Sequence, residues 1–388
     1  MYEKKVALVD VDNSEKIKFP NLLLMKASTY YKDRGFEVKL IHGKLLDRYN
    51  REYEKGKYGN AHKEFLPDIV IKSKVFTWTD DKNLFNSSNN IENYYFGGTG
   101  SDDISRKIEI VDPEIEWQTP DYDLYRGLYH YRSMKFEDAG IGFVTRGCPR
   151  KCSFCFVPDK EGMIKPYMTI DQFVNSNSKK LVLLDNNILA HKHGREQIVR
   201  MRDEEYIVDF NQGLDPRIIA ENERMAKLLS ELKWIYQIRL ACDEQKDKPY
   251  LERAVELLRK HKCKGRMFAY TIITPDVEDA YDRIKFVDSL GVMPYAQSLR
   301  DSKNTEPTPY MKVLQKWVGS QTGFYAFSFE DYLNNILVWD SDKKKFKEVK
   351  DRHKVTKEWS RKNKGKPMSE RNMDLPKTIK EIVDERIN

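Results

Sequence analysis

The sequence predicts an α/β protein with a doubly wound N-terminal domain, a partial (β/α)6 barrel and a small C-terminal extension. Three observations predict this fold class. The 388 residues are 40% hydrophobic and have a mean hydropathy of −0.72, which is typical of a folded chain of two or three domains. Short apolar runs alternate with helical segments, both before and after residue 140. No apolar run reaches the roughly 18 residues that a membrane-spanning helix requires.

Residues 1–111 are expected to form the doubly wound domain, in a flavodoxin-like arrangement. Its predicted strands are residues 6–9, 38–41 and 67–71. Residues 20–34 have helical periodicity, which Gly35 ends. Strands that alternate with helices favour a mainly parallel sheet covered on both faces. The glycine cluster at 97–100 closes the domain, either as a ligand-binding loop or as a plain turn.

Residues 112–140 are expected to be an aromatic linker, because prolines interrupt the periodicity. Its aromatic residues are Trp117, Tyr122, Tyr125, Tyr129 and Tyr131. They either fill a seam between domains, which we favour, or stack on a substrate.

Residues 141–308 then repeat a strand and a helix. The predicted strands are residues 141–144, 181–184, 206–210, 236–240, 267–273 and 292–296, and the helical segments begin near Thr169, Gly194, Pro216, Pro249 and Asp276. Six units are too few for the eight of a closed barrel but suit an open, partial one. The sites of such a fold lie at the carboxyl ends of its strands.

Residues 309–388 form the expected C-terminal extension, with a helix through Trp317 and a hairpin of residues 336–339 and 345–349. The net charge of +7 resides here, because residues 343–388 contain 16 Lys and Arg against 8 Asp and Glu. This basic tail, which includes Trp359, predicts contact with the phosphate backbone of RNA or DNA. A flexible, solubilising end is the alternative.

The cysteines carry the clearest chemical signal. Three of the five lie within eight residues, a clustering that favours metal ligation in a reducing compartment over a disulfide scaffold. Cys148, Cys152 and Cys155 follow the first barrel strand with the spacing CxxxCxxC. Their thiolates can ligate three irons of one cuboidal iron–sulfur cluster and leave the fourth iron open. The alternative is a zinc knuckle, which would need a distant histidine.

Basic residues surround these thiols in the sequence. Arg146, Arg150 and Lys151 are expected to lower the thiol pKa values and to offset the negative charge of a cluster.

This motif, with the aromatic Phe154 before its last cysteine, resembles the radical S-adenosylmethionine (radical SAM) superfamily over residues 141–299. The resemblance implies a four-iron four-sulfur cluster whose open iron binds the amino and carboxylate groups of S-adenosylmethionine. It implies reductive cleavage to a 5′-deoxyadenosyl radical, which abstracts a hydrogen atom from a substrate. It also implies oxygen sensitivity and a reductant such as flavodoxin or ferredoxin.

The resemblance further implies which residues bind the cofactor. Members usually carry a Gly-Gly-Glu-like stretch after the second strand, where this chain reads Leu184-Asp185-Asn186-Asn187. Asp185 is the expected ammonium acceptor, and an Asp-Asn-Asn turn is the alternative. Arg217 is expected to bind the cofactor carboxylate, with helix capping beside Asp215 as the alternative. The full expected set is Phe154, Asp185, Asn187, Gln212, Arg217, Arg239 and Asp243.

The two remaining cysteines limit the subclass. Cys242 and Cys263 cannot supply a second cluster, which disfavours methylthiotransferases and SPASM-type maturases. Cys242 follows the fourth strand and is a candidate catalytic residue that donates or relays a hydrogen atom. A small buried hydrophobe is the more common role of a lone cysteine there.

The N-terminal domain resembles the cobalamin-binding domain of some members. Those members often carry an Asp-x-His-x-x-Gly loop, which is absent here, because His42-Gly43 lacks the preceding aspartate. We expect a relic without cobalamin; binding without a histidine ligand is the alternative.

Together these observations predict a cytoplasmic radical SAM enzyme with no membrane partner. The start of the chain, Met1 to Lys5, is followed by a strand-like run without a small-residue cleavage site. The best-supported substrate is a base of RNA, such as tRNA, or of DNA, because of the basic tail. The alternatives are the same chemistry on a small metabolite or peptide, and a noncatalytic metal-binding interaction protein.

Overall fold

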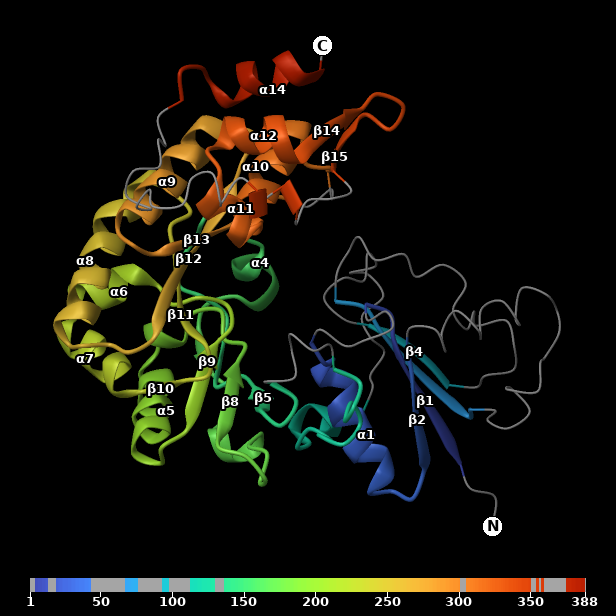
Figure 1. The fold of residues 1–388 in the computed structure, drawn as a ribbon. Coiled ribbons are helices and arrows are strands. Elements are labelled where there is room, and N and C mark those ends of the chain that lie inside the picture. Colours follow the sequence, from blue (N-terminus) through green and yellow to red (C-terminus); the bar gives the residue numbers. More distant parts are fainter. Residues whose placement is uncertain are drawn as a thin grey trace. The chain divides into compact units, whose positions relative to one another are not determined.

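The computed structural model describes residues 4–12, 19–42, 67–75, 93–97, 112–129, 136–300, 305–349, 354–355, 357–358 and 375–387 (Figure 1). The chain divides into two compact units, each described by itself. Unit 1 comprises Met1–Val144, Tyr167–Leu184 and Asp203–Val208, and unit 2 comprises Thr145–Pro166, Asp185–Arg202 and Asp209–Asn388. No helix in the described ranges is both long and apolar enough to cross a membrane.

Unit 1 contains the parallel sheet expected near the N-terminus. The sheet has the order β2-β1-β3-β4, built from β1 (Lys5–Asp10), β2 (Glu37–Ile41), β3 (Ile69–Ser73) and β4 (Asn93–Gly97). All neighbouring strands are parallel. Helix α1 (Leu22–Lys32) packs Leu24 and Ala27 against this sheet, and the Asn21 side chain caps its start by accepting a hydrogen bond from Leu24 N. Residues 98–100 of the glycine cluster, and Gly43, lie outside the described residues.

Of the linker aromatics, Tyr125 and Tyr129 are buried and Tyr122 is partly buried, whereas Trp117 is half exposed. Tyr125 is fully buried, and its hydroxyl donates a hydrogen bond to the buried Asp10 carboxylate at 2.6 Å. The Tyr122 hydroxyl donates to Phe173 O and accepts from Ile141 N. These contacts favour packing over substrate stacking for both residues, whereas Tyr131 lies outside the described residues. The linker also contains the 3-10 helix η1 (Pro113–Trp117).

All six strands predicted after residue 140 are present. One sheet has the order β10-β9-β8-β5, from β5 (Gly140–Gly142), β8 (Lys180–Leu183), β9 (Ile207–Phe210) and β10 (Lys233–Trp234). Another has the order β11-β12-β13, from β11 (Gln237–Ala241), β12 (Arg266–Ile273) and β13 (Met293–Ser298), with all pairs parallel. The described chain is therefore a mixed α/β structure with parallel sheets.

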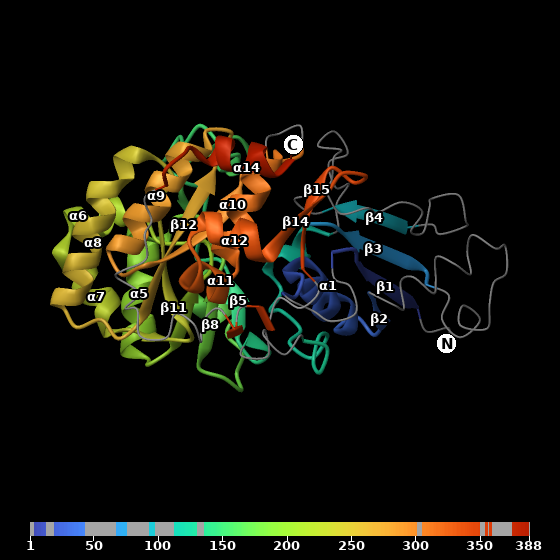
Figure 2. The ribbon, with the colours of Figure 1, turned by 45° about the horizontal axis from the view of Figure 1, so that its top comes forward.

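Helices follow most of these strands, as expected. They are α5 (Lys192–Asp203), α6 (Pro216–Glu221), α7 (Glu223–Glu231), α8 (Lys248–Lys260) and α9 (Val277–Ser289). Figures 1 and 2 show α8 and α9 on one side of the β11-β12-β13 sheet. The helix predicted near Thr169 is wrong, because only the 3-10 turn η3 (Ile170–Gln172) forms. The following Asn-Ser-Asn-Ser run makes its own turn, in which the Asn175 side chain accepts from Asn177 N.

The C-terminal extension shares one apolar core of unit 2 with residues of β12, α9 and β13. Its elements are α10 (Pro309–Gly319), α11 (Gln321–Ala326), α12 (Phe329–Ile336), β14 (Leu337–Asp340), β15 (Lys345–Glu348) and α14 (Ile379–Ile387). Strands β14 and β15 form the predicted hairpin, and Trp317 is fully buried at the centre of the core. Helix α14 buries Ile379 and Val383 in the same core beside α10, so this part of the basic tail is folded (Figure 2). Trp359 lies outside the described residues.

Candidate functional site

The three clustered cysteines lie on one closed loop of unit 2. Strands β6 (Thr145–Arg146) and β7 (Lys165–Pro166) pair antiparallel at its base, and α4 (Val157–Glu161) lies within it. Gly147 has a φ of +82°, and a Cβ there would stand 2.6 Å from Gly162 O, so the two sides of the loop touch at this point. Cys148, Cys152 and Cys155 are partly exposed, and none forms a disulfide.

Two carboxylates anchor the base of this loop. Asp185, which follows β8, is buried and accepts hydrogen bonds from Thr145 N and from Thr145 Oγ1 at 2.6 Å. Glu161 accepts from Gly147 N at 2.8 Å, from the Arg146 guanidinium at 2.8 Å and from Asn186 Nδ2 at 3.0 Å. The predicted ammonium acceptor Asp185 therefore has a positioning role in this structure, and Arg146 pairs with Glu161.

Asp215 joins three segments of the site. It precedes α6 and accepts from Arg150 Nε of the cysteine loop at 2.8 Å and from Asn187 Nδ2 at 3.1 Å. Its other oxygen accepts from Arg217 N at 3.1 Å and Arg217 Nε at 2.8 Å. Burial alone would raise the pKa of Asp215, but hydrogen bonds from Arg217 and Arg150 hold it below its usual range. Arg217 therefore lies beside the loop, and its Nη1 is also 3.5 Å from Asp247 Oδ1.

Asn187, like Arg239 with its buried Nε, is a predicted residue with an open hydrogen-bonding atom among the described residues. Asn187 is only 4% exposed, and its Nδ2 lies 3.7 Å from Cys148 Sγ as well as donating to Asp215. Its buried Oδ1 accepts no hydrogen bond within the described part of the chain. An unpartnered buried acceptor costs free energy unless a ligand donor satisfies it. Asn187 Oδ1 is thus a candidate acceptor for a hydrogen-bond donor of a bound ligand.

The thiols of Cys152 and Cys155 have raised pKa values, contrary to the expectation from the flanking basic residues. Burial raises the pKa of Cys152, and the charges of Cys155 and Cys148 raise it further, against the lowering effect of Arg217. Burial is also the largest cause of the raised pKa of Cys155. The basic side chains do less than predicted because Arg146 and Arg150 pair with Glu161 and Asp215.

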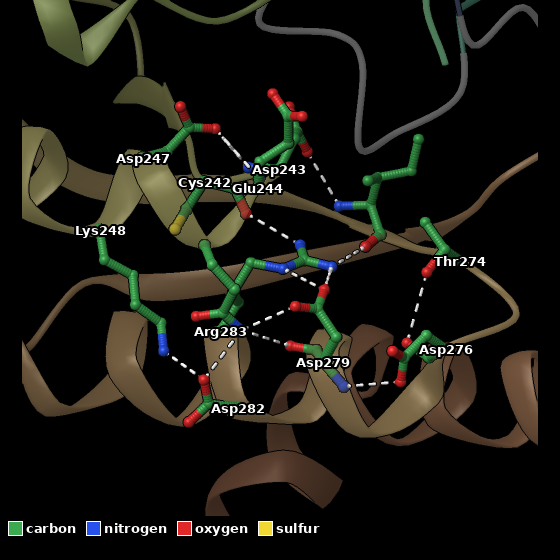
Figure 3. A network of polar contacts seen from close by, with 12 residues as sticks. Cys242, Asp243, Glu244, Asp247, Lys248, Thr274, Asp276, Asp279, Asp282 and Arg283 are labelled. Atoms are coloured by element: carbon green, nitrogen blue, oxygen red, sulfur yellow. Dashed lines mark hydrogen bonds and ion pairs between the residues drawn. The ribbon is translucent and has the colours of Figure 1, made fainter. Parts of the chain in front are cut away.

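Asp243 lies at the carboxyl end of β11, in a network that Figure 3 shows. Its Oδ1 accepts from Ile272 N at 2.9 Å, and its own N donates to Asp247 Oδ2 at 3.2 Å. Burial raises the pKa of Asp243 to about 6. The charge of Asp243 contributes to the raised pKa of Cys155, and the charge of Glu244 contributes to the raised pKa of Cys152, in both cases after burial.

Arg283 on α9 holds that network together, and the sequence alone did not point to it. The residue is 0% exposed; Nη1 donates to Cys242 O at 3.1 Å, and Nη2 donates to Ile272 O at 3.0 Å and Asp279 at 2.7 Å (Figure 3). The available signal was an arginine on the apolar face of a helix, one position before Ile284 and three after Ala280. Cys242 itself is fully buried, and burial raises its pKa to about 12. This environment favours the packing interpretation of Cys242.

The other predicted cofactor residues differ in their surroundings. Arg239 on β11 is mostly buried and donates to Asp209 at 2.6 Å, to Asn211 Oδ1 at 2.9 Å and to Tyr270 OH at 3.3 Å. Gln212 is exposed, and Phe154 is partly buried on the cysteine loop. The structure thus brings Asn187 and Arg217 together with the cysteine loop through Asp215, and it gives Arg239 other partners.

No group of three or more His, Cys, Asp or Glu side chains within the described ranges is arranged to hold a single metal ion. In a cuboidal cluster each thiolate ligates a different iron, so the three sulfur atoms need not converge on one point. The cysteine loop therefore fits such a cluster, because it carries three unbridged thiols. The open Asn187 Oδ1, on the amide next to Cys148, fits a ligand of that cluster.

Comparisons with known proteins give little further information. No protein-family model and no curated protein matches the chain. Among solved structures it is similar to the radical S-adenosylmethionine methyltransferase TsrM from Kitasatospora setae, solved with its tryptophan substrate and an S-adenosylmethionine analogue. The identity is 14%, the TM-score is 0.47, and the match covers 76% of this chain and 73% of that chain. A likeness at this level decides neither the family nor the activity of this protein.

Proposed function

We propose that this protein is a radical SAM enzyme that reductively cleaves S-adenosylmethionine and abstracts a hydrogen atom from a substrate. The observation that carries the proposal is the CxxxCxxC loop with three unbridged thiols, of which Cys148 lies beside the Asn187 amide and its open oxygen. Cys148, Cys152 and Cys155 would hold a four-iron four-sulfur cluster. When bound and reduced, this cluster supplies the electron that divides S-adenosylmethionine into methionine and a 5′-deoxyadenosyl radical.

The surrounding side chains would bind and orient the methionyl end of the cofactor. Asn187 Oδ1 replaces Asp185 as the proposed ammonium acceptor, because Thr145 already occupies the facing Asp185 oxygen. Arg217 would bind the carboxylate through the guanidinium N–H groups that do not donate to Asp215. Asp215 would keep Arg217 and Asn187 in position.

The remaining predicted residues are proposed as further contacts. Asp243 would accept a hydrogen bond from a ribose hydroxyl at the carboxyl end of β11. Phe154, Gln212 and Arg239 would line the rest of the site. Cys242 remains a candidate hydrogen donor only if the turn after β11 opens, because its thiol is fully buried.

The finer architecture is also a proposal. Strands β5, β8, β9, β11, β12 and β13 would form the partial (β/α)6 barrel of residues 141–308. Residues 1–111 would form a flavodoxin-like domain related to cobalamin-binding domains but without cobalamin. Residues 112–140 would link the two, and residues 309–388 would be an extension. We propose a cytoplasmic location, which suits reduced thiols, and a flavodoxin or ferredoxin as reductant.

For the substrate we propose a base of RNA or DNA. The support is the charge of the C-terminal extension, where Lys343, Lys344 and Lys345 are all exposed. A small metabolite or peptide remains the alternative substrate.

Anaerobic reconstitution tests the proposed chemistry. The wild type should bind about four irons per chain and, with dithionite, convert S-adenosylmethionine to 5′-deoxyadenosine. Cys152→Ala should lose both properties. Cys263→Ser is the matched control, because Cys263 is a partly buried cysteine outside the loop, and it should retain both. A wild-type chain that binds zinc and no iron would support a noncatalytic metal-binding protein instead.

A further inference from the structure

We infer that the side-chain amide of Asn187 is a hydrogen-bond donor to the Cys148 thiolate and raises the reduction potential of the cluster that this thiolate ligates. The inference rests on the proposed function, because it requires the cluster. It adds a role that the cysteine motif does not specify, since the donor comes from the loop after β8 rather than from the cysteine loop.

The geometry around Cys148 Sγ supports two hydrogen bonds. Asn187 Nδ2 lies 3.7 Å from the sulfur atom, and Arg150 N lies 3.4 Å from it. A neutral thiol is only a weak acceptor, but a thiolate carries a full charge and makes the hydrogen bond charge-assisted. Both contacts should therefore strengthen when Cys148 ligates iron.

Asp215 fixes which atom of the Asn187 amide faces the sulfur. An ionised carboxylate can only accept hydrogen bonds, so the amide atom 3.1 Å from Asp215 Oδ2 must be the NH2 group. The same NH2 group has a second proton, and Cys148 Sγ is the second acceptor within reach. The oxygen of the amide then remains for the ammonium group of the cofactor. One buried amide would thus contact both the cluster ligand and the cofactor.

The sign of the effect follows from charge. Reduction adds one electron to the cluster and increases the negative charge on its thiolate ligands. N–H donors stabilise the more negative, reduced form and so raise the reduction potential. Removal of the Asn187 amide should shift the potential to a more negative value and make reduction by dithionite less complete.

The test is an EPR-monitored potentiometric titration of the reconstituted protein without S-adenosylmethionine. Asn187→Ala should have a more negative midpoint potential than the wild type. Asn186→Ala is the matched control, because its amide is in the same loop but donates to Glu161 Oε2 at 3.0 Å. This control should keep the wild-type potential. Equal potentials for the wild type and Asn187→Ala would overturn the inference.

A second measurement does not use Asn187→Ala, in case that variant fails to hold the cluster. Wild-type protein labelled with 15N-asparagine should give a 15N coupling to the reduced cluster in pulsed EPR, and Asn186→Ala should retain it. A wild type that contains the cluster but shows no such coupling would overturn this inference and leave the proposed function standing. A wild type that binds no cluster would instead overturn the proposed function, so the two failures are distinguishable.

Discussion

Asp185 and Asn187 are two residues apart and equally buried, but their partners give them different roles. Asp185 faces the cysteine loop, and Thr145 donates to it from both its backbone and its side chain. Asn187 donates toward Asp215 and Cys148 and keeps its oxygen open. The charge of Asp185 made it the more obvious ammonium acceptor in the sequence. Because of these partners, we propose Asn187 as the ammonium acceptor in its place.

The turn after β11 predicts a pH dependence of stability. The pKa of Asp243 is raised from 3.8 to about 6, mainly by burial and further by Asp247 and Glu244, against Ile272 N–H and Arg283. Between about pH 4 and pH 6 the folded chain therefore keeps a proton that the unfolded chain has lost. The contribution of this residue to the free energy of unfolding should fall as the pH rises through that window, by at most about 3 kcal/mol.

Asp243→Asn should remove this fall, because an amide oxygen can still accept from Ile272 N but never ionises. Urea unfolding from pH 4 to pH 8 should show the variant gaining stability over the wild type as the pH rises, with a constant difference above about pH 7. The control is Asp342→Asn, at an exposed carboxyl in the β14–β15 turn. Parallel curves for the wild type and Asp243→Asn would contradict the prediction.

At the scale of elements, the cysteine loop depends on one close crossing. Gly147 and Gly162 both have positive φ, +82° and +74°, but only at Gly147 would a Cβ meet other atoms. Gly162→Ala should therefore cost about 1–3 kcal/mol of backbone strain and leave the loop closed. Gly147→Ala should also push the loop away from Gly162 O and lower the iron content after reconstitution. Equal iron content in the two variants would show that the crossing does not shape the cluster site.

The Arg283 network makes a prediction about packing between elements. Arg283→Met would leave the carbonyls of Cys242 and Ile272 without their buried donor, and Asp279 without its partner. The free energy of unfolding should fall on the order of 3 kcal/mol. Arg253→Ala is the control, since Arg253 is half exposed in a surface pair with Glu256, and it should change stability by about 0.5 kcal/mol or less. Similar losses in urea unfolding would contradict the buried role of Arg283.

The sequence predicted the elements well where the pattern was local. The apolar runs that became β8, β11 and β12 and the hairpin of β14 and β15 needed only periodicity and turn residues. The helix near Thr169 failed because asparagine and serine side chains bonded to their own backbone. The pairing of Arg283 was not predictable from the pattern, because its partners lie 41 and 11 residues away.

At the scale of the whole molecule, the candidate site combines separate segments of unit 2. The cysteine spacing identified one segment, but only tertiary contacts reveal that Asp215 bonds to Arg150 and Asn187, 65 and 28 residues away. The sequence therefore identifies candidate ligand residues. It does not tell which of these residues already have hydrogen-bond partners in the folded chain. The sequence analysis did not identify Asp215 and Arg283, which hold other residues in position, as functional candidates.

The charge distribution gives the last prediction, on nucleic-acid binding. Truncation after Lys343 would be a poor test, because it removes β15 and the buried Ile379 and Val383 of α14. A better variant replaces five exposed lysines of the basic tail by glutamine: Lys343, Lys344, Lys345, Lys354 and Lys357. If they bind phosphates, affinity for single-stranded RNA should fall, and the slope of log K against log salt should flatten by roughly 0.7 for each phosphate that is no longer neutralised.

The control variant must change the net charge equally. Five exposed lysines elsewhere in unit 2 serve this purpose: Lys227, Lys233, Lys260, Lys262 and Lys264. A general effect of net charge would weaken binding equally in both variants, because distant charges act only through the screened field. A local interaction with phosphates would flatten the salt dependence in the tail variant alone. Equal slopes in the wild type and both variants would exclude these tail lysines as the nucleic-acid binding surface and would favour a small metabolite or peptide as substrate.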